Sequence, residues 1–139
     1  FRSTNFMIQR NLFLSIKFEE KMKRYEDVYF GKVLRQKNIK VLHIDNPVVM
    51  NDFESNPDYI NKIELDARIL STFSDELKGY SHLLTLANTL RRMPPLYYSV
   101  RTWHWAFGKA ERNILTGSHP CLKLLNIYRI GYFLSNKQY

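Results

Sequence analysis

Two adjacent carboxylates, Glu26 and Asp27, are the best candidates for chemistry in this sequence. They follow Tyr25 and a basic run, and they begin a segment whose apolar residues recur at helical spacing. Helix N-terminal amides and basic neighbours favour the ionised form of a carboxylate. An ionised carboxylate can take the proton of a sugar or alcohol hydroxyl while that oxygen attacks. Acids are also common in the first turn of helices without a catalytic role, so the pair alone is a weak signal.

Metal-binding and nucleotide-binding motifs are missing from the sequence. No H-E-x-x-H, P-loop, G-x-G-x-x-G or G-x-S-x-G pattern occurs. The acidic stretch 52–54 can approach a divalent cation, but it is equally typical of a loop before a capped helix. Metal-ligand spacing is absent among the four histidines, which are His43, His82, His104 and His119.

Aromatic and basic residues alternate in the segment 98–115, which contains Trp103, Trp105, Arg101 and Lys109. Such a mixture can stack on nucleic-acid bases or lie at a lipid headgroup boundary, and it can equally be a core face with basic neighbours. The helical stripe Val100, Trp103, Phe107, Ala110 and Ile114 predicts that Trp103 is buried. Trp105 falls off this stripe and is the better surface candidate.

The helices and strands expected around these residues indicate an α+β, mainly helical fold. Short β-rich runs at 5–9 and 40–44 flank a helix that begins at Glu26, which indicates an α/β unit at the front. Residues 1–54 form this first predicted domain and residues 55–139 a second, helical one. The helices expected in the second domain are 55–79, with Ser55 or Asn56 as cap, 81–92, 98–115 and 121–134.

The net charge of +8 lies entirely in the second half of the 139-residue chain. Residues 1–76 carry twelve basic and twelve acidic side chains, whereas residues 77–139 carry nine basic ones and a single acid, Glu111. This asymmetry predicts a polyanionic partner, either nucleic acid or an anionic membrane surface, although a solvated face that aids solubility fits equally well.

Composition excludes several protein classes. With 45% hydrophobic and 24% charged residues the chain fits neither a disordered segment nor a coiled coil. The lone Cys121 excludes an intramolecular disulfide framework and a multi-cysteine zinc site. We find no signal peptide and no apolar run near the roughly 18 residues that span a bilayer. Since the chain begins without Met, we expect it to start inside a longer protein.

Three stretches resemble, in the same order and with similar gaps, the C-terminal half of bacterial family 2 glycosyltransferases. They are 5–13 (NFMIQRNLF), 25–31 (YEDVYFG) and 43–48 (HIDNPV). The tail 125–133 (LNIYRIGYF) is similar to the closing helix of one branch of that family. The resemblance covers most of the chain.

The resemblance implies the end of a GT-A fold, which is a Rossmann-like nucleotide-binding half followed by an acceptor-binding half. It also implies an inverting transfer from a nucleotide-sugar donor to a glycan or lipid-linked acceptor hydroxyl. Asp27 matches the general base, and Glu26 would hold the acceptor or orient that base. We expect Tyr25 and Trp105 to contact the acceptor.

Two departures from the family concern the metal. The family holds its Mg²⁺ or Mn²⁺ on an upstream Asp-x-Asp motif, which this chain lacks. A histidine that tends to follow Asn-Pro-Val is replaced by Met50, a poor ligand for a hard cation. We therefore expect the divalent cation only in the full-length enzyme, and we expect this fragment, or degenerate copy, to be inactive alone.

The basic tail has a corresponding role if the resemblance holds. Acceptors for cell-envelope polysaccharides are often lipid-linked glycans made at the cytoplasmic face of the inner membrane. Each Lys or Arg near an anionic leaflet contributes about 1 kcal/mol of attraction. The residues predicted to dock on the membrane are Arg91, Arg92, Arg101, Lys109 and Arg112.

Other partners stay open. A basic helical module that binds nucleic acid is the alternative, but no helix-turn-helix, zinc-finger or RNA-binding sheet signature supports it. A helical domain that binds a protein partner is a third interpretation. The apolar edge of the front unit predicts a homodimer if no other segment covers it.

Overall fold

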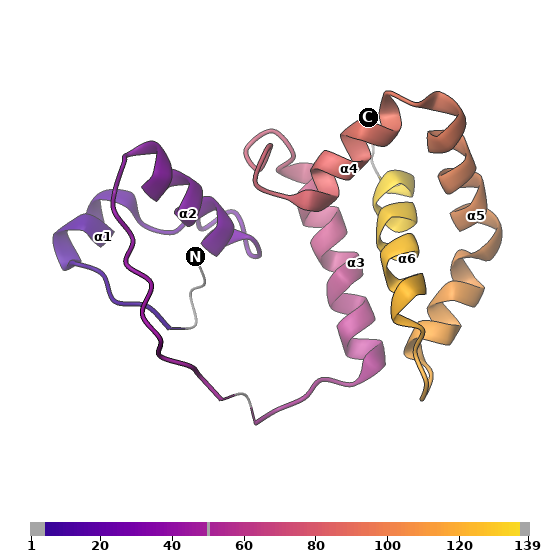
Figure 1. The fold of residues 1–139 in the computed structure, drawn as a ribbon, viewed down its shortest axis with the longest axis horizontal. Helices are drawn as coiled ribbons and strands as arrows, with labels where there is room; N and C mark the ends of the chain where they lie inside the picture. The colour runs from indigo at the N-terminus through magenta and orange to yellow at the C-terminus, as the bar shows by residue number, and fades with distance from the viewer. Residues whose placement is uncertain (1–4, 50, 137–139) are drawn as a thin grey trace. The chain divides into compact units, whose positions relative to one another are not determined.

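The computed structural model describes residues 5–49 and 51–136. The chain divides into a front unit, residues 1–53, and a helical unit, residues 54–139 (Figure 1). Helices α1 and α2 belong to the front unit, and α3 to α6 belong to the helical unit. Their bounds are α1 Arg10–Ile16, α2 Glu26–Gln36, α3 Asn56–Thr72, α4 His82–Arg91, α5 Pro94–Thr116 and α6 Leu122–Ser135.

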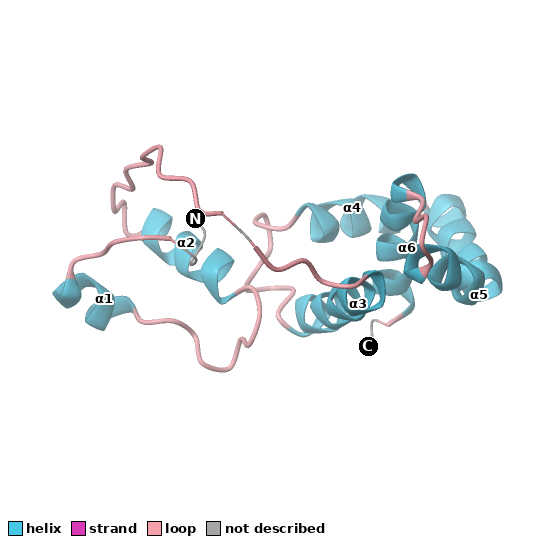
Figure 2. Ribbon diagram, turned by 90° about the horizontal axis from the view of Figure 1, so that it is seen from below, coloured by secondary structure: helices cyan, strands magenta, loops and turns pink. Residues whose placement is uncertain are grey.

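The described residues contain helices and loops but no strand, so the predicted α+β fold with a Rossmann-like GT-A portion is wrong (Figure 2). Both runs that predicted strands, 5–9 and 40–44, are non-helical loop segments here. Asn5 Nδ2 donates a hydrogen bond to the backbone oxygen of Asn46, two residues beyond the second run, at 2.9 Å. A strand requires a ladder of backbone hydrogen bonds to a neighbour, and a pair of short segments is at best marginally stable in water.

A cluster of phenylalanines forms the core of the front unit. Phe30 from α2 is 1% exposed, and its ring centroid lies 4.7 Å from that of Phe18 and 6.1 Å from that of Phe13. Phe6 packs against Phe18 edge to face at 6.2 Å. These contacts bring the N-terminal loop, α1 and the connection to α2 onto one helix face. Met22 and Leu34 are buried alongside them.

Serine caps begin two helices of the helical unit, and Ser55 is one of the two residues that the sequence predicts as a cap. Ser55 Oγ accepts the amide of Asp58 at 3.3 Å before α3, and Ser81 Oγ accepts the amide of Leu84 at 3.4 Å before α4. These bonds satisfy amides that have no partner inside the helix. The expected helix to residue 79 ends earlier, at Thr72, and turns follow over 73–80.

Helix α6 contacts α3, α4 and α5, and it lies between α3 and α5 in Figure 1. The buried residues of α6 lie in its C-terminal half, at Tyr128, Ile130, Gly131, Phe133 and Leu134. Ile60 and Ile63 of α3, Leu115 of α5 and Tyr128 of α6 form a continuous buried cluster. The packing of apolar helix faces therefore holds the helical unit together.

Helix α5 is longer than predicted, and the side of it that is buried is not the predicted one. It begins at Pro94 rather than residue 98, because a proline in the first turn loses no intrahelical hydrogen bond. The buried residues are Tyr97, Glu111 and Leu115. Trp103, expected in the core, is 48% exposed, so the predicted buried stripe is wrong.

Within the described residues, no helix has both the length and the apolar character that crossing a membrane requires.

Candidate functional site

Glu26 and Asp27 occupy the first turn of α2, at the point that the sequence predicts for a helix start. Tyr25 precedes them with φ 65°, in the left-handed region that residues with a side chain rarely adopt. Its carbonyl accepts the amide of Tyr29 at 2.9 Å, which closes the first helical turn. The helix therefore begins directly after the left-handed residue Tyr25, and the two carboxylates are its first two residues.

The two carboxylates have different surroundings. Asp27 Oδ1 accepts the backbone amide of Val28 at 2.8 Å, which fixes one oxygen of a half-buried group. Glu26 Oε2 is buried and has no hydrogen-bond donor among the described residues. Buried carboxylate oxygens are normally hydrogen-bonded, because desolvation without a partner is costly. The site thus has one anchored carboxylate beside one acceptor atom that lacks a donor.

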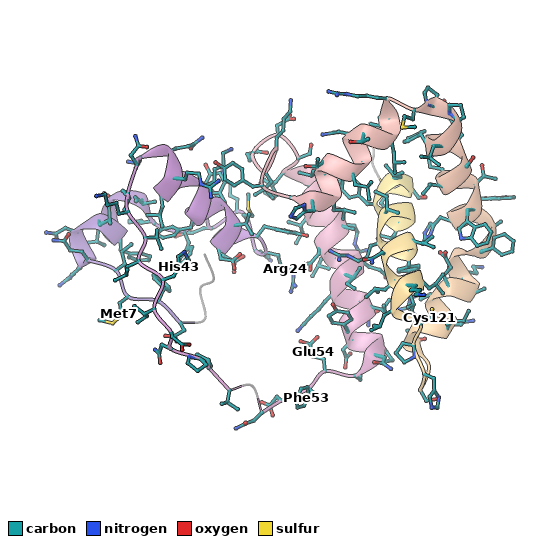
Figure 3. All side chains as sticks on the ribbon, viewed as in Figure 1. Met7, Arg24, His43, Phe53, Glu54 and Cys121 are labelled. Carbon is teal, nitrogen blue, oxygen red and sulfur yellow. The ribbon has the colours of Figure 1, made fainter. Side chains whose placement is uncertain are left out.

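A pocket of about 760 Å³ lies in the front unit, but neither Glu26 nor Asp27 lines it. It is lined by residues 5–9 and 39–44, together with Leu12, Leu34 and Asn46. Met7 and His43 represent these two segments in Figure 3. The volume is in the range of small-molecule sites. Sequence reasoning missed this pocket, because the composition of the two stretches that line it predicts strands.

The acceptor-binding residues predicted from the resemblance belong to different units. Tyr25 is half-buried at the start of α2, adjacent to Glu26. Trp105 is on α5 in the helical unit and is 86% exposed. Their joint contact with one acceptor stays a prediction.

The five predicted membrane-docking residues have two kinds of environment. Arg92 and Lys109 are exposed, Arg91 donates to Asn88 Oδ1 at 3.1 Å, and Arg101 donates to Tyr97 Oη at 3.3 Å. Arg112 differs from the other four, because it contacts two α3 residues, as described next.

Glu64 joins three helices through its carboxylate. Its Oε1 accepts Arg112 Nε of α5 at 2.9 Å and Tyr128 Oη of α6 at 2.6 Å. Arg112 also donates to Asn61 Oδ1 at 2.6 Å. The bond to Glu64 raises the pKa of Arg112, and burial together with the same carboxylate raises the pKa of Tyr128. The cluster therefore stabilises the α3–α5–α6 packing.

Glu111 of α5 is buried, at 2% exposure, whereas Glu64 is only half-buried. Glu111 accepts Trp103 Nε1 at 2.8 Å and lies 3.2 Å from His104 Nδ1. The His104 ring packs against Tyr128 and Tyr132 at 5.3 and 6.1 Å. A single acid seven and eight residues after His104 and Trp103, on one helix face, is a sequence signal that could have revealed this cluster.

The described residues do not fit a divalent-cation site. No group of three or more His, Cys, Asp or Glu side chains in the described part of the chain is placed to hold a metal ion. Met50, where the resemblance places a histidine, lies outside the described residues. The expectation that this chain binds no metal stays a prediction, and no step below uses one.

Comparisons with family models, curated proteins and solved structures found no match to this chain. The resemblance to family 2 glycosyltransferases thus stands on the three quoted stretches and the tail.

Proposed function

We propose that this chain supplies acceptor-side residues to an inverting sugar transferase. The enzyme would transfer a sugar from a nucleotide-sugar donor to a hydroxyl of a glycan or a lipid-linked acceptor in the cytoplasm. The observation that carries the proposal is the buried Glu26 Oε2, which has no donor among the described residues and stands next to Asp27. A bound acceptor hydroxyl is a donor of the kind that this oxygen lacks.

Asp27 takes the role of general base in this proposal. The acceptor oxygen forms a bond to the anomeric carbon while its proton passes to the Asp27 carboxylate. The bond from the anomeric carbon to the diphosphate breaks, and the nucleoside diphosphate leaves with the electron pair. The Val28 amide holds one Asp27 oxygen at 2.8 Å, so the other oxygen is available for the proton. A positioned base contributes about 10² to 10⁴ in rate.

Glu26 has a supporting role. When the half-buried Glu26 side chain turns toward solvent, its Oε2 becomes accessible, accepts the hydrogen bond of an acceptor hydroxyl and thereby orients the substrate toward Asp27. Removing the negative charge at Glu26 should raise the KM for the acceptor more than it lowers kcat, because the contact is made with bound substrate.

The test measures sugar transfer by the natural polypeptide that contains these residues, with a panel of nucleotide sugars. We expect Asp27→Asn to lower kcat about 10²-fold or more and to leave donor binding and far-ultraviolet circular dichroism unchanged. Asp75→Asn is the matched control, since Asp75 is exposed in the turns after α3. Near-normal turnover in Asp27→Asn would reject the base, and loss of activity in both variants would point to a general charge effect.

A further inference from the structure

Helix α5 carries an apolar row whose side chains the described residues leave partly exposed. Its members follow one another at alternating spacings of four and three residues. This is the heptad spacing along which two helices pack against each other. Its four largest side chains are each between 45% and 49% exposed, so nothing in the described part of the chain covers them fully. We call this row the α5 seam, and its residues are Leu96, Val100, Trp103, Phe107, Ala110 and Ile114.

The seam lies beside the buried side of α5. Trp103 precedes His104 by one residue, which corresponds to a rotation of about 100° about the helix axis. The His104 ring packs against Tyr128 of α6 with centroids 5.3 Å apart. A second helix can therefore lie along the seam without displacing α6, because α5 is an outer helix of the helical unit (Figure 1). Trp103 is held in place before any partner binds, since its Nε1 donates to the buried Glu111 at 2.8 Å and its ring centroid lies 4.5 Å from that of Phe107.

The seam is symmetric about residue 105. Its members lie nine, five and two residues from this centre in both directions along the helix. When two such helices run antiparallel about the centre, each member meets the one at the same distance on the other helix. An aliphatic side chain then always meets an aliphatic one, and an indole ring meets a phenyl ring. The three pairs are Leu96 with Ile114, Val100 with Ala110, and Trp103 with Phe107.

The solvent-facing flank of the seam has no charge. Ser99, Ala106 and Asn113 form it, each exposed and each one residue before a member of the seam. Short side chains at a helix contact let the two helices approach closely. The basic residues of α5 are turned by about 140° or more from the seam, so they do not face each other across it. They are Arg101, Lys109 and Arg112.

We propose that two copies of this chain associate through an antiparallel pair of α5 helices that meet along the seam. The symmetric spacing carries the proposal, because a two-fold interface brings the same surface of both copies together and must be complementary to itself. An unrelated partner helix would require no such symmetry. Burial of the partly exposed apolar side chains stabilises the pair. The apolar edge of the front unit takes no part in this contact, and the proposal is independent of sugar transfer.

Sedimentation equilibrium of the full chain tests the association. We expect a monomer–dimer equilibrium that shifts toward the dimer as salt rises, because each copy carries a net charge of +8 and salt screens the repulsion. Ala110→Lys places a charge in the seam and should weaken dimerisation more than about tenfold. Thr102→Lys is the matched control, since it adds the same charge at an exposed position about 120° from the seam, and should change the dissociation constant less than about threefold.

Three results of this experiment overturn the proposal. The first is a chain that stays monomeric at every concentration and salt tested. The second is equal weakening by the seam variant and its control, provided that both keep the far-ultraviolet circular dichroism of the wild-type chain. The third is an association that salt weakens, because bridging by a bound polyanion such as nucleic acid behaves in that way.

Cysteine cross-linking tests the antiparallel direction, in a Cys121→Ser background that removes the only native thiol. Ala106 lies one residue from the centre, so Ala106→Cys places the thiols of the two copies beside the two-fold axis. Asn113 lies eight residues from it, so Asn113→Cys separates them by about 24 Å along the helix. We expect a short bis-maleimide to join copies of Ala106→Cys and to leave Asn113→Cys largely unlinked. Both positions are exposed and on the same side of α5. Equal linking of the two variants, or of neither, overturns the proposal.

Discussion

The front unit and the helical unit bury their apolar residues to different extents. The helical unit encloses Leu70, Leu77, Ala87 and Phe133 completely, and it pairs the carboxylates inside it. The front unit encloses a small cluster around Phe30 and leaves large side chains exposed along its loops. Those are Met7, Leu42, Ile44, Val48, Val49 and Phe53. The difference teaches that the helical unit has an extended interior and leaves apolar side chains exposed on its helices, such as Trp103 and Trp105 of α5, whereas the front unit has a small interior and leaves them exposed mainly along its loops.

The largest expected effect separates the stabilities of the two units. Phe30→Ala removes the centre of the phenylalanine cluster and should cost the front unit about 3–5 kcal/mol. We expect hydrogen exchange to show loss of protection in α1 and α2 while α3 to α6 keep theirs. Phe53→Ala, at an exposed position, is the control. Simultaneous loss in both units would break the comparison, because it would mean that they unfold together.

Glu111→Ala should be the most damaging polar change in the helical unit. It leaves the Trp103 indole N–H without its acceptor and removes the partner of His104. We expect a loss of about 3 kcal/mol in the free energy of unfolding by urea. Glu54→Ala, which removes an exposed ion pair with Lys62, should cost at most about 0.5 kcal/mol. Similar costs for the two variants would contradict the assigned burial.

Gly131→Ala probes the close approach of α5 and α6. A Cβ at Gly131 would lie 2.7 Å from the His104 Cβ, so one helix must shift. We expect a cost of about 2 kcal/mol in thermal or urea unfolding. Gly117→Ala is the control, because its nearest atom would lie 3.4 Å away and its φ of −73° suits any residue. A neutral Gly131→Ala would show that the helices are farther apart than described.

Tyr128→Phe should have the smallest effect and a distinct pH dependence. Loss of its bond to the Glu64 carboxylate should cost about 1.5 kcal/mol at pH 8. Burial raises the pKa of Tyr128 in the folded state, so above about pH 10 the unfolded chain loses this proton first. The wild-type chain should therefore lose more stability than Tyr128→Phe between pH 8 and pH 10.5. Parallel losses in urea titrations of the two chains would refute this role, and Tyr59→Phe serves as the exposed control.

Local signals predicted the helices well. Ser55 and Ser81 each satisfy an amide of the following first turn, and such a cap depends only on neighbouring residues. The Glu26–Asp27 pair likewise marks a helix start in the structure. Pro94 and Pro95 begin α5, because proline tolerates the first turn of a helix.

Signals that depend on distant partners failed. The runs 5–9 and 40–44 have strand composition, but strand formation needs hydrogen-bonding neighbours that local sequence does not specify. The rotation of α5 depends on which of its sides α6 contacts. Glu64 and Tyr128 are 64 residues apart, so no spacing rule connects them. Sequence patterns therefore could not predict the pocket of the front unit or the Glu64 cluster.

The exposed join between the two units has a consequence for the handling and turnover of the protein. Phe53, labelled beside Glu54 in Figure 3, is 91% exposed in a loop at the boundary of the units. Endoproteases that cleave after aromatic residues need an accessible side chain on a stretch of chain that fits their cleft. A brief chymotrypsin digest should accordingly nick the chain here first, liberating a compact helical product from a front piece that is degraded further.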